Sequence, residues 1–127
     1  MSADDSRLDP SAAAALSQLR RTAEWLRSLP LRRLTEEHSP VAGGARLLVT
    51  RVDELTRVVC ADSPHCEECP PGSVRPPAVD SSVLGVQLAA HSDQLARVLL
   101  VCGPRSQPAL SEGLTELAAA ALELRRG

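Results

Sequence analysis

All ten prolines of this chain lie outside four windows, and this placement constrains the fold more than any other feature of the sequence. The windows cover residues 11–29, 41–63, 78–103 and 109–127. Proline removes a helix hydrogen bond and clashes with the preceding turn, so long proline-free windows between prolines are typical of helices and their boundaries. The pattern predicts four helices of similar length.

Each window also carries apolar residues three or four positions apart, the spacing of a buried helix face. The second window has the most regular repeat, formed by Val41, Ala45, Leu48, Val52, Leu55 and Val59. The stripes of the other windows are Leu16, Leu19, Ala23, Leu26 and Leu29; Leu84, Leu88, His91, Leu95, Val98 and Cys102; and Leu110, Leu114, Leu117, Ala121 and Leu124. Such rows predict the seams of a helical bundle. The solvent face of the second helix is expected to hold Arg46, Thr50, Asp53, Glu54 and Arg57.

The expected fold class is all-α, an antiparallel four-helix bundle within a single domain that covers residues 9–127. Residues 1–8 are small, polar and acidic, and we expect a disordered amino-terminal tail there. The second and third helices are joined by a long irregular loop over residues 61–80, which is rich in proline and cysteine. A connection of this length permits either a hairpin or a crossover, so the sequence leaves the helix directions open.

Charge and composition exclude several classes of function. The net charge is −2, which gives no overall field for nucleic acid or a membrane surface, and one Trp without Phe or Tyr offers little for base stacking. No apolar run approaches the roughly 20 residues that cross a bilayer, and residues 1–5 are acidic where a secretory signal is basic. We expect a cytoplasmic protein with neither nucleic acid nor membrane as a partner. The absence of residues with AT-rich codons indicates a GC-rich bacterial genome, such as that of an actinomycete.

The sharpest candidate site is a group of thiol and imidazole side chains, Cys60, His65, Cys66 and Cys69. The Cys66–Cys69 spacing is that of half a tetrahedral zinc site, and Cys60 and His65 would supply the other ligands. Cys66 and Cys69 also have the spacing for a local exchange between dithiol and disulfide. The remaining alternative is an exposed loop whose cysteines have no function. A hairpin between the second and third helices would leave Cys102 about 30 Å away, and only a crossover or a dimer would bring it near.

His91 is the other candidate for chemistry, because it interrupts an apolar stripe. Histidine phosphotransfer domains are helical bundles with a reactive histidine, but here no cation follows within the next four residues, which end at Leu95. A core histidine satisfied by a neighbour is the simpler interpretation. Glu36, Glu37 and His38 lack the Glu-x-x-His spacing of di-iron bundles.

These observations predict a small helical protein that is not an enzyme and acts as a protein–protein interaction or regulatory module. Its expected partner is another protein or a second copy of the chain. No catalytic or cofactor-binding residue is expected. The alternative is a zinc- or redox-responsive regulator built on Cys60, His65, Cys66 and Cys69.

Overall fold

A computed structural model describes residues 10–36, 39–61, 83–102 and 108–126. These residues form no strand and five helices, namely α1 (Pro10–Ser28), α2 (Leu31–Thr35), α3 (Pro40–Ala61), α4 (Leu84–Cys102) and α5 (Pro108–Arg126). The all-α prediction is therefore confirmed for the part of the chain that the structure describes. The expected tail at residues 1–8 and nearly all of the 61–80 loop lie outside the described residues.

Prolines mark the helix boundaries as the sequence predicts. Helices α1, α3 and α5 each begin at a proline, and α1 ends before Pro30. Ser39 caps α3, because its side-chain Oγ accepts a hydrogen bond from the Ala42 backbone N–H at 3.2 Å. A serine before a first-turn proline satisfies an amide that has no partner within the helix, which explains the sharp start of α3.

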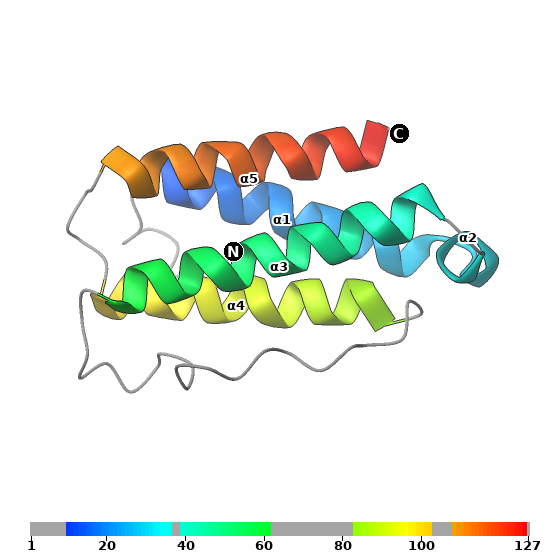
Figure 1. The fold of residues 1–127 in the computed structure, drawn as a ribbon, viewed down its shortest axis with the longest axis horizontal. Helices are drawn as coiled ribbons and strands as arrows, with labels where there is room; N and C mark the ends of the chain where they lie inside the picture. Colours follow the sequence, from blue (N-terminus) through cyan, green and yellow to red (C-terminus); the bar gives the residue numbers. More distant parts are fainter. Residues whose placement is uncertain (1–9, 37–38, 62–82, 103–107, 127) are drawn as a thin grey trace.

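The four long helices lie side by side in Figure 1. Helix α1 packs against α4 and α5, and α3 packs against the same two helices. The contact between α3 and α5 is less extensive than the other three, and the short α2 packs on α3. The side of the molecule where α3 meets α5 is therefore its most loosely closed side. Within the described ranges, no helix combines the length and apolarity that a bilayer crossing requires.

The core is made of leucine, valine and alanine, as the predicted stripes require. Its largest fully buried apolar side chains are Leu16, Leu19, Leu26, Leu84, Leu88, Leu95, Val52 and Val98. Leu55 and Leu124, both predicted stripe residues, are only partly buried and pack against the edge of this core. The prediction that Asp53 faces solvent is wrong, because Asp53 is buried where α3 packs on α4.

The four pairs of packed long helices include both parallel and antiparallel pairs. In Figure 1, α1 and α5 run from the left of the view to the right, whereas α3 and α4 run from right to left. Close approaches of α3 to α5 agree with this, since Gly44 lies against Leu124 and Gly113 lies against Leu55. Neighbours α1–α4 and α3–α5 are thus antiparallel, while α3–α4 and α1–α5 are parallel. Neighbouring helices are not all antiparallel, because α4 begins at the end of the molecule opposite to the end of α3.

Candidate functional site

The structure describes only one of the four residues of the predicted cysteine site. Cys60 lies in the last turn of α3, whereas His65, Cys66 and Cys69 lie outside the described residues. Among the residues the structure does describe, no three His, Cys, Asp or Glu side chains come together as metal ligands. Because α3 and α4 run in parallel, Cys60 and Cys102 both belong to final turns at the same end of the molecule. The crossover is therefore the connection that brings the two helix ends carrying these cysteines together.

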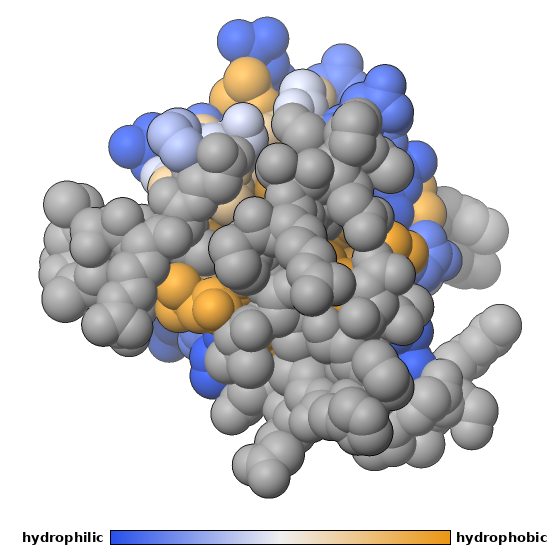
Figure 2. Space-filling model, turned by 90° about the vertical axis from the view of Figure 1, so that its left-hand side faces the viewer, coloured by the Kyte–Doolittle hydropathy of each residue, from blue (hydrophilic) through white to orange (hydrophobic). Residues whose placement is uncertain are grey.

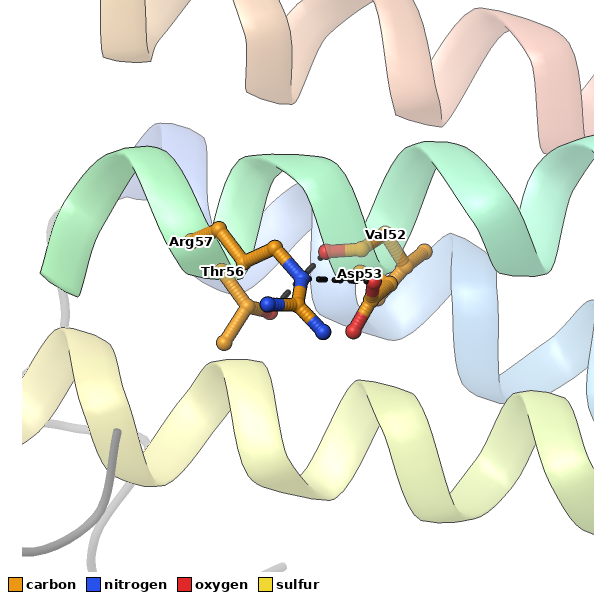
Figure 3. Close-up of polar contacts among 4 residues, drawn as sticks. All are labelled: Val52, Asp53, Thr56 and Arg57. Carbon is orange, nitrogen blue, oxygen red and sulfur yellow. Dashed lines mark hydrogen bonds and ion pairs between the residues drawn. The ribbon is translucent and has the colours of Figure 1, made fainter. Parts of the chain in front are cut away.

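A polar cluster lies on the side of α3 that faces α4. Arg57 Nε donates to Asp53 Oδ2 at 3.0 Å, one helical turn apart, and Figure 3 shows the two side chains facing each other. The nearby Thr56 hydroxyl donates to the Val52 carbonyl at 2.9 Å. Burial of Asp53 is tolerable because the guanidinium provides an opposite charge and a charge-assisted hydrogen bond.

His91, on α4, is half-buried and interacts electrostatically with Asp53 of the same cluster. Burial lowers the pKa of His91 from its ordinary value of 6.5, and the negative charge of Asp53 acts in the opposite direction. Burial is the larger effect, because an apolar environment disfavours the imidazolium form. His91 is therefore a neutral imidazole near pH 7.

The hydroxyls of this region are satisfied within their own helices. Ser92, next to His91, is fully buried and donates to the Leu88 carbonyl at 2.7 Å. Because Ser92 and Thr56 both bond the carbonyl four residues earlier, neither hydroxyl is aimed at a reacting group. The cluster has the features of a structural ion pair within α3, on the side of that helix that faces α4.

A second feature is a surface groove between α3 and α5, with a volume of about 340 Å³. We call it the α3–α5 groove, and its lining residues are Arg51, Glu54, Leu55, Val58, Gly113, Glu116 and Leu117. Leucine, valine and glycine provide its apolar lining, and one arginine and two glutamates provide charges. An apolar depression with a few charges is the usual character of a binding surface.

Glycine sets the shape of the α3–α5 groove. A Cβ placed on Gly113 would lie 3.0 Å from Leu55 Cδ1, so the missing side chain lets Leu55 reach across to α5. At the other end of the helix pair, a Cβ on Gly44 would lie 2.7 Å from Leu124 Cδ1. The two helices thus approach closely at two glycines, although their contact is less extensive than that of the other neighbouring pairs.

The outer surface of α3 beside this groove carries a second repeat, which we call the outer α3 stripe. It consists of Leu47, Arg51, Glu54 and Val58. Leu47 is 53% exposed and Val58 is 52% exposed, which is high for large apolar side chains. The outer α3 stripe was not predicted from the sequence, because the more regular apolar repeat on the buried face of α3 dominates the hydrophobic pattern of this helix. The signal was present in the spacing of four, three and four residues.

Figure 2 looks onto the end of the molecule where α3 and α4 end and α5 begins. In this view the described residues show as hydrophilic areas mainly at the top and right, with smaller hydrophobic areas among them. Several large apolar side chains of the described residues are exposed, and two of them, Leu47 and Val58, lie on one face of α3, which makes the outer α3 stripe a candidate site.

No family model, curated protein or solved structure matches this chain. The functional argument therefore depends on the geometry and chemistry of the described residues. Of these, the α3–α5 groove and the outer α3 stripe lie on the surface, whereas the Asp53–Arg57 pair is turned toward α4.

Proposed function

We propose that this protein is a non-catalytic interaction module that binds a helix of a second polypeptide along the outer α3 stripe. The observation that carries the proposal is the exposure of Leu47 and Val58 on the same helix face, beside a partly apolar groove. Isolated exposed apolar residues are common on protein surfaces and need no explanation. Two such residues three turns apart, with a groove along the same face, match the anchor spacing of a helix that lies in a groove.

The way in which the groups of the polar cluster are engaged supports a non-catalytic role for it. Asp53 bonds Arg57 on the same helix, and the two buried hydroxyls bond backbone carbonyls. A catalytic base or nucleophile needs a hydrogen-bond partner positioned for proton transfer to a substrate. The cluster provides an ion pair within α3 instead, which neutralises a buried carboxylate where α3 packs on α4.

We further propose that the four long helices form a four-helix bundle that serves as a rigid scaffold for this surface. The continuous leucine and valine core supports this interpretation, because tight packing fixes the face that each helix turns outward. The outer α3 stripe is then held in place before binding. A preorganised surface loses less conformational entropy when a partner docks.

Site-specific photo-cross-linking tests the proposed function. The residue p-benzoylphenylalanine would replace Leu47 in the full chain, expressed and irradiated in the host cell. We expect an adduct with a protein chain, whose identity mass spectrometry gives. The adduct should be lost when Val58→Arg is added, because a charged side chain would then meet the apolar face of the partner helix.

Val86 provides the matched control, since it is 56% exposed on α4 and lies outside the α3–α5 groove. The same cross-linker at Val86 should give no adduct, and Val86→Arg should not change the adduct formed from position 47. An absence of any adduct at position 47, or an adduct that persists with Val58→Arg, would refute the proposed function.

The zinc- or redox-responsive regulator is a second candidate, and one observation favours it. The parallel directions of α3 and α4 bring the helix ends that carry Cys60 and Cys102 to the same end of the molecule. This places Cys102 at the same end as Cys60, as a further thiol for a tetrahedral site there. In this hypothesis Cys60, His65, Cys66 and Cys69 bind one zinc ion, or Cys66 and Cys69 form a disulfide.

Metal content and thiol titration distinguish these possibilities. Protein purified without chelator should contain about one zinc per chain if the site exists, because a complete four-ligand set binds zinc tightly. The double substitution Cys66→Ser with Cys69→Ser should then remove the metal. Four titratable thiols in metal-free protein would eliminate this second function.

A further inference from the structure

We infer that the partner of the outer α3 stripe is the same stripe of a second copy of this chain, aligned antiparallel about a two-fold axis. This inference rests on the proposed function and names its partner. In a two-fold symmetric interface one surface patch meets itself, so residue i contacts residue j and residue j contacts residue i. A patch suited to such contact must be complementary to its own reversed sequence.

The outer α3 stripe has this property. Its members Leu47, Arg51, Glu54 and Val58 are separated by four, three and four residues, a spacing that reads the same in both directions. When two such helices align antiparallel about the midpoint between Arg51 and Glu54, Leu47 of one copy faces Val58 of the other. The same alignment sets Arg51 against Glu54, and the two-fold axis repeats each contact.

The charges select the antiparallel alignment. A parallel pairing in register would place Arg51 against Arg51 and Glu54 against Glu54, and like charges across a helix interface are unfavourable. No ion pair engages Arg51 or Glu54 within the described part of the chain, so both are available to a second copy. The dimer would therefore form two intermolecular ion pairs flanked at each end by apolar contacts.

The α3–α5 groove adds a second acid near the centre of this interface. The contacts of Gly113 with Leu55 and of Gly44 with Leu124 set the levels of α3 and α5 along their antiparallel axes. On this register Glu116 lies level with the middle of the outer α3 stripe. Arg51 of the second copy is then attracted by Glu116 as well as by Glu54, since both line the same groove.

Charge-reversal variants test the register. Sedimentation velocity on the full chain should show a species of twice the 13.5 kDa chain mass whose fraction rises with concentration. Arg51→Glu or Glu54→Arg alone replaces both intermolecular ion pairs with like-charge contacts, and should weaken the dimer about tenfold or more. The double variant Arg51→Glu with Glu54→Arg restores opposite charges, so its dissociation constant should return to near the native value.

Mixing the two single variants gives a sharper test. A chain with Arg51→Glu carries two acids in the stripe, and a chain with Glu54→Arg carries two bases. The mixture should therefore form heterodimers in preference to either homodimer. Arg21→Glu on α1 is the matched control, because it makes the same charge change at an exposed position outside the stripe and should leave the dimer unchanged.

Three results would overturn the inference: a monomer at all concentrations up to about 1 mM, a dimer insensitive to Arg51→Glu, or a double variant as weak as its parents. The experiments distinguish an error in the proposed partner from an error in the proposed function. A monomer that cross-links through position 47 to a different protein overturns the second copy but retains the interaction function. A monomer that gives no adduct overturns both.

Discussion

The close approach of α1 to α4 leads to a prediction about Gly85. A Cβ placed there would lie 2.7 Å from Arg27 Cγ, 2.9 Å from the Ala23 carbonyl oxygen and 3.1 Å from the Arg27 backbone nitrogen. Two of these three atoms belong to the backbone of α1, so they cannot move aside as the end of a side chain can. By contrast, a Cβ on Gly43 would meet no atom within 4 Å.

These distances determine whether each of the two substitutions raises or lowers the free energy of unfolding. Replacing glycine by alanine inside a helix stabilises the folded state by up to about 1 kcal/mol through backbone entropy. Forcing an extra carbon into a packed contact costs about 1–3 kcal/mol. Gly43→Ala should therefore raise the free energy of unfolding by about 0.5–1 kcal/mol. Gly85→Ala should lower it by about 1–2 kcal/mol, since the strain exceeds the gain.

Urea denaturation followed by circular dichroism measures both changes, and the slope with denaturant should stay the same because the folded surface is unchanged. Gly44→Ala is a useful third variant. Its new carbon would meet only the end of the Leu124 side chain at 2.7 Å, which can rotate away, so its effect should fall between the other two. A Gly85→Ala protein as stable as the Gly43→Ala protein would refute the close packing of α1 on α4.

Three further predictions follow from the core and the polar cluster. In an NMR titration the pKa of His91 should lie below 6.5, and Asp53→Asn should lower this pKa further because the carboxylate favours the imidazolium form. Because the folded-state pKa is lower than the unfolded-state pKa, protonation of His91 opposes folding. The stability that the neutral imidazole contributes is therefore lost as the pH falls below 6.5 toward the folded-state pKa. Leu88→Ala should cost about 2–5 kcal/mol in thermal or urea unfolding, whereas Val86→Ala should change stability by no more than about 0.5 kcal/mol, because Leu88 is fully buried and Val86 is 56% exposed. Thr22→Val should cost about 1 kcal/mol, since the buried hydroxyl bonds a backbone carbonyl on α1 and another on α5; an unchanged stability would show that this link between the helices contributes nothing.

The helices and most of the core could be predicted from the sequence because local physics determines them. Pro10, Pro40 and Pro108, each directly before a predicted window, begin helices in the structure. The regular row from Val41 to Val59 is buried except for Leu55, which lies at the edge. Such features depend on the spacing of residues within one helix, so a single sequence contains them.

The helix directions, the burial of Asp53 and the α3–α5 groove could not be predicted because they depend on contacts between helices. Residues 61–80 permitted a hairpin or a crossover with similar chain entropy. The burial of Asp53 follows from α4 packing beside α3 in parallel, which places a charged residue at that interface. The groove follows from the loose contact of α3 with α5, which no pattern within either helix encodes.

The helix directions also divide each end of the molecule electrostatically. At the end where α3 and α4 finish, their carboxyl termini lie together on one half, and the amino termini of α1 and α5 occupy the other half. Helix dipoles make the first half partly negative and the second partly positive, whereas an all-antiparallel arrangement would alternate the two signs. Cys60 and Cys102 occupy the negative half. An anion that approaches this end of the molecule is therefore favoured over the amino-terminal half and disfavoured over the carboxyl-terminal half.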